Sequence, residues 1–231
     1  MRFRVPKGFS LERARESQRK LSKKVIKEDR LPEKIGYIAG VDVAYLGKFA
    51  FGAVAVLEYT SLKLIETKTS KVEVKFPYIP TLLSFREVSP AMAAIRKLNV
   101  EPDVFLVDGQ GIAHPFRFGF ASHLGVVLNK PTIGVAKSLL CGKIEKNPEK
   151  EGEFTFIYDN NEVIGAVLLS KWGFKPIYVS VGHMVSLENA VKIVKNCVRK
   201  YRIPEPIRMA HIAANKMKRA FDVSSKSAEI S

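Results

Sequence analysis

Three β-type segments follow one another in the first third of the chain, at residues 35–43, 49–57 and 62–74. The links between them are short, and the first link contains Gly47, a residue typical of tight turns. Strands joined by such short links run antiparallel, because a parallel pair needs a crossover of a dozen or more residues. The chain therefore begins with a predicted antiparallel meander and is expected to build its fold on a sheet.

The remainder of the chain alternates between helical and β-type patterns. Ser89 and Pro90 are expected to open a helix that reaches about residue 98, with proline in the first helical position. After it the patterns predict strands at 103–108, 132–136, 154–158, 163–169 and 177–181, and helices at 118–128, from the capping Ser186 to about residue 201, and at 207–220. This order predicts an α/β fold, in which helices flank a mixed sheet of antiparallel and parallel strands. The RNase H-like arrangement begins in the same order.

No linker or internal repeat divides the chain, so residues 1–231 are expected to form a single domain. Residues 1–30 form a basic N-terminal segment with eleven Lys or Arg and four acidic side chains, a net charge of +7. From Ser10, a candidate N-cap, apolar positions recur at spacings of three and four, which predicts an amphipathic helix. The polar tail at residues 222–231 is expected to be frayed.

The charge balance favours a polyanionic partner. Lys and Arg number 38 against 23 acidic residues, giving a formal net charge of +15, so nucleic acid is the first candidate. A membrane surface is the other polyanion, but the chain has neither an 18-residue apolar run nor a signal-peptide pattern. We therefore expect a soluble cytoplasmic protein that does not bind membranes. Cys141 and Cys197 lack the spacing of a zinc site or a disulfide framework.

Two aspartates stand at unusual positions. Asp42 lies inside the apolar run IAGVDVAY, where an ionised carboxylate is costly to bury without a partner. Alternation along a strand puts it on the same face as Gly40 and Ala44, whose small side chains are expected to leave room around the carboxylate. Asp108 ends the run VFLVD, at the carboxyl edge where α/β sheets place ligands. A salt bridge is the alternative for Asp42, and a turn-forming Asp-Gly pair for Asp108.

In an RNase H-like sheet the first and fourth strands are parallel neighbours, so Asp42 and Asp108 are expected to meet. Two close carboxylates repel unless a proton or a cation bridges them, and oxygen ligands suit Mg²⁺ or Mn²⁺. Glu87 is the third acid of this set, although a carboxylate there is also placed to stabilise a helix start. Together the three acids provide what metal-assisted phosphodiester hydrolysis requires.

Tyr78 stands between prolines in KFPYIPT, on a loop whose conformations proline restricts. Its ring either wedges between bases or anchors the loop to the core. His211, on the last predicted helix, is either a histidine at the edge of the core or a proton carrier. His114, His123 and His183 have no spacing typical of zinc ligands, and each is expected to be structural when taken alone.

Six blocks together resemble the endonuclease V family: IAGVDVAY, FPYIPTLLSFRE, LVDGQGIAHPFRFGFASHLGV, PTIGVAKSLLCG, VGHMVSLENAV and the late AH. They span about Ile38 to His211, and their order and spacing make the resemblance specific. It implies an RNase H-like fold and a Mg²⁺-dependent endonuclease, with Mn²⁺ as a substitute. The implied reaction hydrolyses the second phosphodiester bond 3′ to a deaminated base such as inosine, in DNA or RNA.

The resemblance also implies roles for individual residues. Asp42, Asp108 and Glu87 match the catalytic, metal-binding carboxylates of the family. Lys137, in GVAKS, and His211 match catalytic positions near the scissile phosphate. The implied substrate-binding residues are the PYIP wedge, with Tyr78 as the wedge itself, and a loop beside the flipped base. They are Pro77, Tyr78, Ile79, Pro80, Gly109, Gly111 and His114.

Three positions depart from the family pattern. Thr81 stands where glycine usually follows PYIP, Phe116 where HPRR has arginine, and Val181 where SPGH has proline. Thr81 is expected to narrow the base pocket, because glycine permits closer backbone approach. Two other functions fit the residues: a non-catalytic nucleic-acid-binding protein, and an RNase H-like nuclease acting on branched junctions or RNA hybrids.

Overall fold

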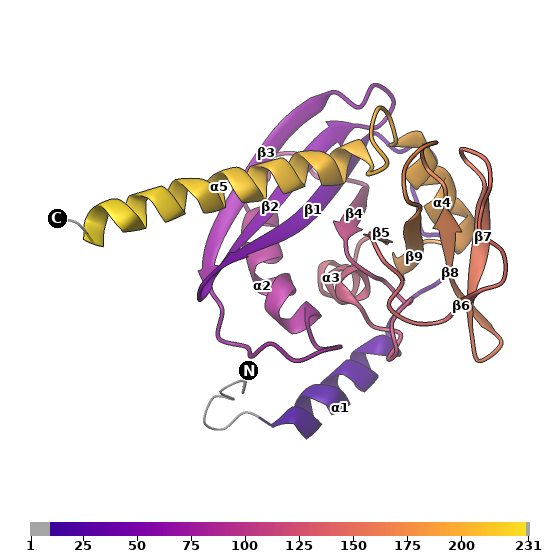
Figure 1. Cartoon of the computed structure of the whole chain (residues 1–231), viewed down its shortest axis with the longest axis horizontal. Coiled ribbons are helices and arrows are strands. Elements are labelled where there is room, and N and C mark those ends of the chain that lie inside the picture. The colour runs from indigo at the N-terminus through magenta and orange to yellow at the C-terminus, as the bar shows by residue number, and fades with distance from the viewer. Residues whose placement is uncertain (1–9, 230–231) are drawn as a thin grey trace.

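The computed structural model describes residues 10–229 of the chain. A nine-stranded sheet runs through it in the order β3-β2-β1-β4-β5-β9-β8-β7-β6, with helices on both of its faces (Figure 1). The elements are α1 (Leu11–Ser22), β1 (Tyr37–Leu46), β2 (Phe49–Glu58), β3 (Leu64–Glu73), α2 (Ser84–Ile95), β4 (Val104–Asp108), α3 (Phe120–Leu128), β5 (Thr132–Ala136), β6 (Lys143–Ile144), β7 (Phe154–Asp159), β8 (Glu162–Leu168), β9 (Ile177–His183), α4 (Leu187–Asn196) and α5 (Glu205–Glu229). The mixed α/β fold and its RNase H-like order are confirmed.

The predicted meander is present. β1 pairs with β2, and β2 with β3, in antiparallel register. β4 then lies parallel to the other side of β1, and β5 parallel to β4. The sheet therefore changes from antiparallel to parallel pairing at β1, and β1, β4 and β5 run in the same direction.

Helices α2 and α3 cover one face of the sheet, while α4 and α5 cover the other. Alternate residues of β1 belong to the two core layers: Val41 is in the cluster that includes α2 and α3, and Ile38 is in the cluster that includes α4 and α5. Figure 1 shows α5 lying across the meander strands, with its far end projecting beyond the sheet. This helix, from the end of the chain, therefore lies over the first strand.

The helix predicted from Ser89 begins earlier, at Ser84, and Pro90 lies inside it. The prediction of proline in the first helical position was wrong. Pro90 has no N–H to donate within the helix, but its carbonyl accepts a hydrogen bond from Ser70 Oγ at 2.7 Å. The backbone is also so close to β2 that a Cβ on Gly52 would lie 2.2 Å from the Pro90 oxygen. Packing against the sheet thus keeps α2 helical through Pro90, although proline disfavours the interior of a helix.

Two helix ends differ from the predictions. Ser186 caps α4 as predicted, but the helix ends at Asn196 instead of near residue 201, because the Cys197 carbonyl accepts from the Glu205 N–H at 2.8 Å. Helix α5 continues to Glu229, through most of the tail expected to be frayed from residue 222. Phe221 supports this extension by packing its ring on Phe49 and Phe51.

The N-terminal helix α1 begins after the predicted N-cap and ends at Ser22. Ser10 caps α1, and its Oγ accepts from the Arg13 N–H at 3.2 Å. The buried position of the helix is Gln18, whereas Leu11 is 49% exposed. The basic residues Arg2, Arg4 and Lys7 lie outside the described residues. No helix within residues 10–229 is long and apolar enough to cross a membrane.

Candidate active site

Asp42 and Asp108 stand on neighbouring parallel strands. β1 and β4 pair with Val41 opposite Val107, so the next residue of each strand is an aspartate. Both side chains are largely withdrawn from water, with 11% of Asp42 and 13% of Asp108 exposed. The predicted strand order therefore brings the two carboxylates together in a poorly solvated place.

The face of β1 that carries Asp42 is covered by α5. A Cβ added to Gly40 would lie 1.9 Å from the carbonyl oxygen of Pro206, so only glycine permits this approach. Ala44, on the same face, is in one core cluster with Ala214 of α5. The small residues were expected to leave room around the carboxylate, but the space is taken by a helix.

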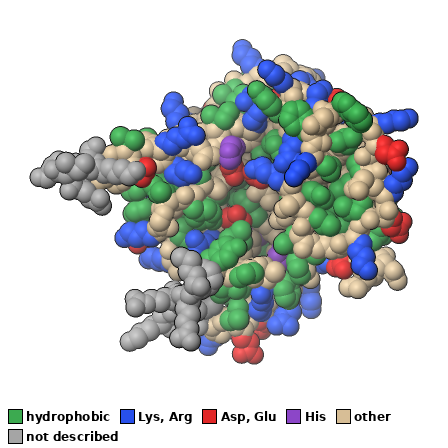
Figure 2. Space-filling view, viewed as in Figure 1, with side chains coloured by type: hydrophobic (Ala, Val, Ile, Leu, Met, Phe, Trp, Pro, Cys, Tyr) green, Lys and Arg blue, Asp and Glu red, His purple; other side chains and the backbone are tan. Residues whose placement is uncertain are grey.

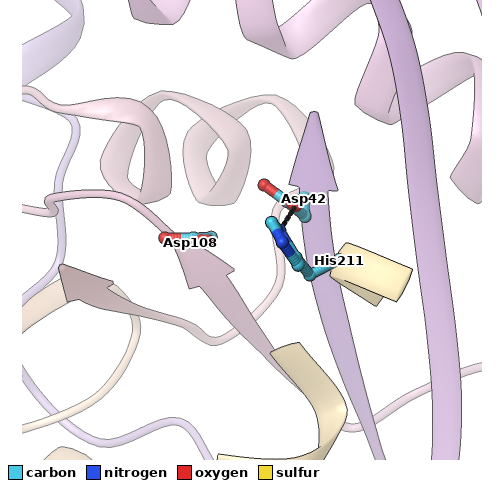
Figure 3. A group of neighbouring side chains, drawn as sticks. All are labelled: Asp42, Asp108 and His211. Carbon is cyan, nitrogen blue, oxygen red and sulfur yellow. Dashed lines mark hydrogen bonds and ion pairs between the residues drawn. The ribbon is translucent and has the colours of Figure 1, made fainter. Parts of the chain in front are cut away.

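Helix α5 brings His211 to the site. Its Nδ1 lies 2.7 Å from Oδ2 of Asp42, and 52% of its side chain is exposed. Ligand atoms of Asp42, Asp108 and His211 all lie within 4.8 Å of one another. Figure 3 shows the imidazole against Asp42, with Asp108 on the adjacent strand. Two carboxylates and an imidazole at this spacing are a donor set that can hold a divalent cation.

Lys137 contacts the second carboxylate. It follows β5, and its Nζ lies 2.5 Å from Oδ2 of Asp108. Burial raises the pKa of Asp108, the charge of Asp42 raises it further, and the Lys137 ammonium opposes both. The net shift is upward, so the Lys137 ammonium does not fully offset the burial of Asp108 and its repulsion by Asp42.

Glu87 lies in the first turn of α2, on the opposite side of the sheet from α5. It is not one of the residues whose ligand atoms lie within 4.8 Å of one another. Burial raises its pKa to about 8, and Asp42 and then Asp108 add to the effect. Glu87 thus senses the charge of both aspartates, while its role as a metal ligand stays a prediction.

A cavity of about 340 Å³ opens beside the carboxylates. Most of the residues implied by the resemblance line it. These residues are Tyr78, Pro80, Glu87, Asp108, Gly109, His114 and Lys137. The other lining residues are Thr81, Leu83, Ser84, Gln110, Gly119, Phe120, Ala136 and Leu140. Tyr78 is 45% exposed. The cavity therefore joins the loop of Tyr78 to the acidic centre.

Three of the implied substrate-binding residues do not line this cavity. Pro77 is buried and Ile79 is half-buried in the loop that carries Tyr78. Gly111 packs against β9, because its N–H donates to Ser180 Oγ at 2.9 Å and a Cβ there would lie 2.0 Å from the Val181 oxygen. Its contacts are those of a packing residue.

His114 and two departures from the family pattern, Thr81 and Phe116, lie in loops, whereas the third, Val181, lies in β9. Burial lowers the pKa of His114 to about 4, so the ring is neutral at pH 7, and its Nδ1 accepts from the Phe116 N–H at 3.1 Å. Thr81 adopts a φ of 69°, in the left-handed region that glycine occupies more easily. Val181 is 2% exposed, and its carbonyl accepts from the Ile112 N–H at 2.8 Å.

Sequence reasoning missed several residues at the site. Gln110 lines the cavity, and Tyr45 lies close enough to Glu87 and Asp42 that their charges add to burial in raising the pKa of its hydroxyl. Gln18 and Arg15 of α1 contact the loop that carries Tyr78. Only Gln18 carried a signal, because it is a polar residue on the apolar stripe of a predicted helix.

The sequence profile of the family described as Endonuclease V matches residues 19–212. The chain belongs to this family. A curated endonuclease V from Thermofilum pendens is 49% identical over 212 residues, which are 91% of this chain and 90% of the relative. Endonuclease V is by name a nuclease, so membership makes this chain a phosphodiester hydrolase.

Solved endonuclease V structures have the same fold. The protein from Streptomyces avermitilis superposes with a TM-score of 0.86 at 38% identity, covering 94% of this chain and 98% of its own. The protein from Ciona intestinalis, in complex with a DNA that contains an inosine followed by a ribo-adenosine, has a TM-score of 0.81 at 36% identity. That match covers 91% of this chain and 98% of the Ciona chain.

The surface of this endonuclease V homologue is consistent with an anionic substrate. On the face drawn in Figure 2, acidic and histidine side chains gather near the middle, and Lys and Arg side chains are spread around them. Over the whole chain, Lys and Arg outnumber acidic residues by 15. Long-range attraction to a polyanion and a local anionic centre therefore coexist.

Proposed function

We propose that this protein is a Mg²⁺-dependent endonuclease that recognises deaminated bases, inosine above all, and hydrolyses the second phosphodiester bond on their 3′ side. Mn²⁺ is expected to substitute. The observation that carries the proposal is the position of one cavity, which reaches from Tyr78 to Asp108 at the acidic centre. The inosine-containing DNA bound by the Ciona relative supports the same substrate class.

The donor set fits a hard divalent cation. Asp42 and Asp108 offer carboxylate oxygens in a poorly solvated place, where their mutual repulsion favours a bridging cation. His211 lies within the same group of side chains, and Glu87 adds a further carboxyl at the cavity. A divalent cation held there supplies charge neutralisation at a phosphate and activation of water.

The chain's own residues have complementary tasks. The Lys137 ammonium, paired with Asp108, is placed to attract a phosphate oxygen and to hold its charge as the bond breaks. Asp42 fixes the orientation of the His211 imidazole through Nδ1, so the exposed ring is positioned to move a proton at the scissile phosphate. These groups reach the site from β1, β4, the end of β5 and α5, a helix that packs on the sheet.

Base recognition is assigned to the opposite end of the cavity. Tyr78 lies on a loop restricted by Pro77 and Pro80, and its half-exposed ring is placed to stack on a base or to fill the gap that a flipped base leaves. His114, neutral and buried, lines the wall. A flipped base in this cavity would place its own strand beside the carboxylates.

The decisive experiment incubates the protein and Mg²⁺ with matched DNA and RNA oligonucleotides, each with and without one inosine, and maps every cut. We expect cleavage at the second phosphodiester bond 3′ to the inosine, and no cleavage with Asp42→Ala. Metal-independent binding without cuts would instead support a non-catalytic binding protein. Cuts at junctions or hybrids without inosine would support another RNase H-like nuclease.

A further inference from the structure

Helix α1 contains one fully buried residue, and that residue is polar. The Gln18 side chain donates from Nε2 to the Thr81 carbonyl at 2.7 Å and to the Phe118 carbonyl at 3.4 Å. Its Oε1 accepts from Nη1 of Arg15 at 3.0 Å. A buried amide with its hydrogen-bonding groups used in this way ties together segments that are far apart in sequence.

Arg15 reinforces this contact from the preceding turn of α1. Its Nη2 donates to the Pro80 carbonyl at 3.3 Å, and its guanidinium carbon lies 4.5 Å from the centre of the Phe116 ring. Two side chains of α1 therefore hold two segments: the loop of Tyr78, and the segment 116–118, which lies between the cavity-lining residues His114 and Gly119. Pro80 and Thr81 line the cavity directly.

The held loop is strained at Thr81. A β-branched residue at a φ of 69° is an outlier, and its Oγ1 is buried with no partner among the described residues. The Thr81 backbone has two partners, since the His114 ring also hydrogen bonds to it. Contacts to the backbone, and not to the threonine side chain, thus hold this conformation.

We propose that Gln18 is a positioning residue that sets the width of the base cavity, and hence the preference for inosine, by holding Thr81 in its left-handed conformation. The preference for inosine in this proposal rests on the proposed function, whereas the positioning of the loop does not. Loss of the donor removes one of the two partners of the Thr81 backbone and leaves the buried Phe118 carbonyl without Gln18, and such a loss costs enough to shift a strained loop. The loop would then relax, and Tyr78 would leave its place at the cavity.

Gln18→Glu is the sharpest perturbation, because it keeps the size of the side chain and removes the donor. Ser17→Ala is the matched control, since Ser17 is the exposed neighbour on the same helix. We compare kcat/KM on inosine-containing DNA with kcat/KM on unmodified DNA, and expect Gln18→Glu to reduce this ratio about tenfold. The loss should appear as a higher KM for inosine-containing DNA, while kcat at saturation stays within about twofold of the parent. Ser17→Ala should leave both parameters unchanged.

A second background tests the role of strain. In Thr81→Gly the left-handed conformation is unstrained, so Gln18→Glu should cost less than about threefold there. Hydrogen exchange of the amides at residues 78–85 gives a readout without substrate: it should quicken in Gln18→Glu and stay unchanged in Ser17→Ala. Equal costs in both backgrounds, or unchanged exchange, would overturn the positioning role.

The same measurements separate this proposal from the proposed function. Faster hydrogen exchange in Gln18→Glu would support the positioning role even if the parent protein cut DNA with and without inosine equally well. That equal cutting by the parent would refute inosine as the substrate. A lower melting temperature for Gln18→Glu, with an unchanged inosine ratio and KM, would show a merely structural contact and refute the specificity role.

Discussion

Replacing Asp108 by asparagine should stabilise the protein without metal and destabilise it, relative to the parent, with metal. Asp42 and Asp108 have ligand atoms within 4.8 Å, and two unit charges at that distance repel by about 3.5 kcal/mol at an effective dielectric constant of about 20. Lys137 offsets part of this repulsion, although water screens its charge because 43% of its side chain is exposed. We expect Asp108→Asn to gain about 1 to 2 kcal/mol in EDTA.

Added Mg²⁺ should reverse the order. A cation at one hundred times its dissociation constant stabilises the folded parent by about 2.7 kcal/mol, while a variant without one ligand gains much less. Thermal unfolding in EDTA and in Mg²⁺ measures both effects, and each kcal/mol corresponds to about 2 to 4 °C for a chain of this size. Cleavage by Asp108→Asn should fall at least about a thousandfold, equivalent to about 4 kcal/mol.

Glu101→Gln is the control for this experiment, because it removes an acid that is 76% exposed and that, within residues 10–229, forms its ion pair with Lys130. It should change stability by less than about 0.5 kcal/mol in both buffers. If Asp108→Asn were less stable than the parent in EDTA, or if Mg²⁺ raised both melting temperatures equally, the two aspartates would not form a cation site.

Three further outcomes are expected. Tyr78→Ala should lose stacking worth about 1 to 3 kcal/mol, mainly on inosine-containing substrate, and single-turnover cleavage should recover partly at saturating protein; a wild-type preference for inosine would leave Tyr78 as a loop anchor. Gly40→Ala should lower stability by about 3 kcal/mol in denaturant titrations and reduce cleavage by displacing His211, whereas Gly36→Ala, whose Cβ has 3.6 Å of clearance, should do neither. Deleting residues 1–8, all of which lie outside the described residues, should lower the slope of log K against log salt by about 0.9 for each lost phosphate contact, and an unchanged slope would exclude such contacts.

The sequence predicted the site best where a residue contradicted its surroundings. Asp42 in an apolar strand and Asp108 at a strand end were identifiable because burying a carboxylate is costly, and the strand order then placed them together. Glu87 was also identified, but its helix was predicted to start after it. Local preference favours Pro90 at a helix start, whereas the contacts of Pro90 with Gly52 and Ser70 hold it in mid-helix.

Other parts of the site were not accessible from local patterns. The buried amide of Gln18 hydrogen bonds to residues 63 and 100 positions away, and no periodicity reveals which loops a helix will contact. The extension of α5 to Glu229 likewise depends on Phe221 meeting the rings of β2. Such contacts are set by tertiary packing, which overrides local preference.

Gly40 shows how a correct observation led to a wrong cause. Its small size was interpreted as room for the Asp42 carboxylate, yet it serves the close approach of Pro206 at the start of α5. That approach places His211, 169 positions from Asp42 in sequence, at 2.7 Å from its carboxylate. Gly40 therefore permits the short distance between β1 and α5 at which His211 can reach the Asp42 carboxylate.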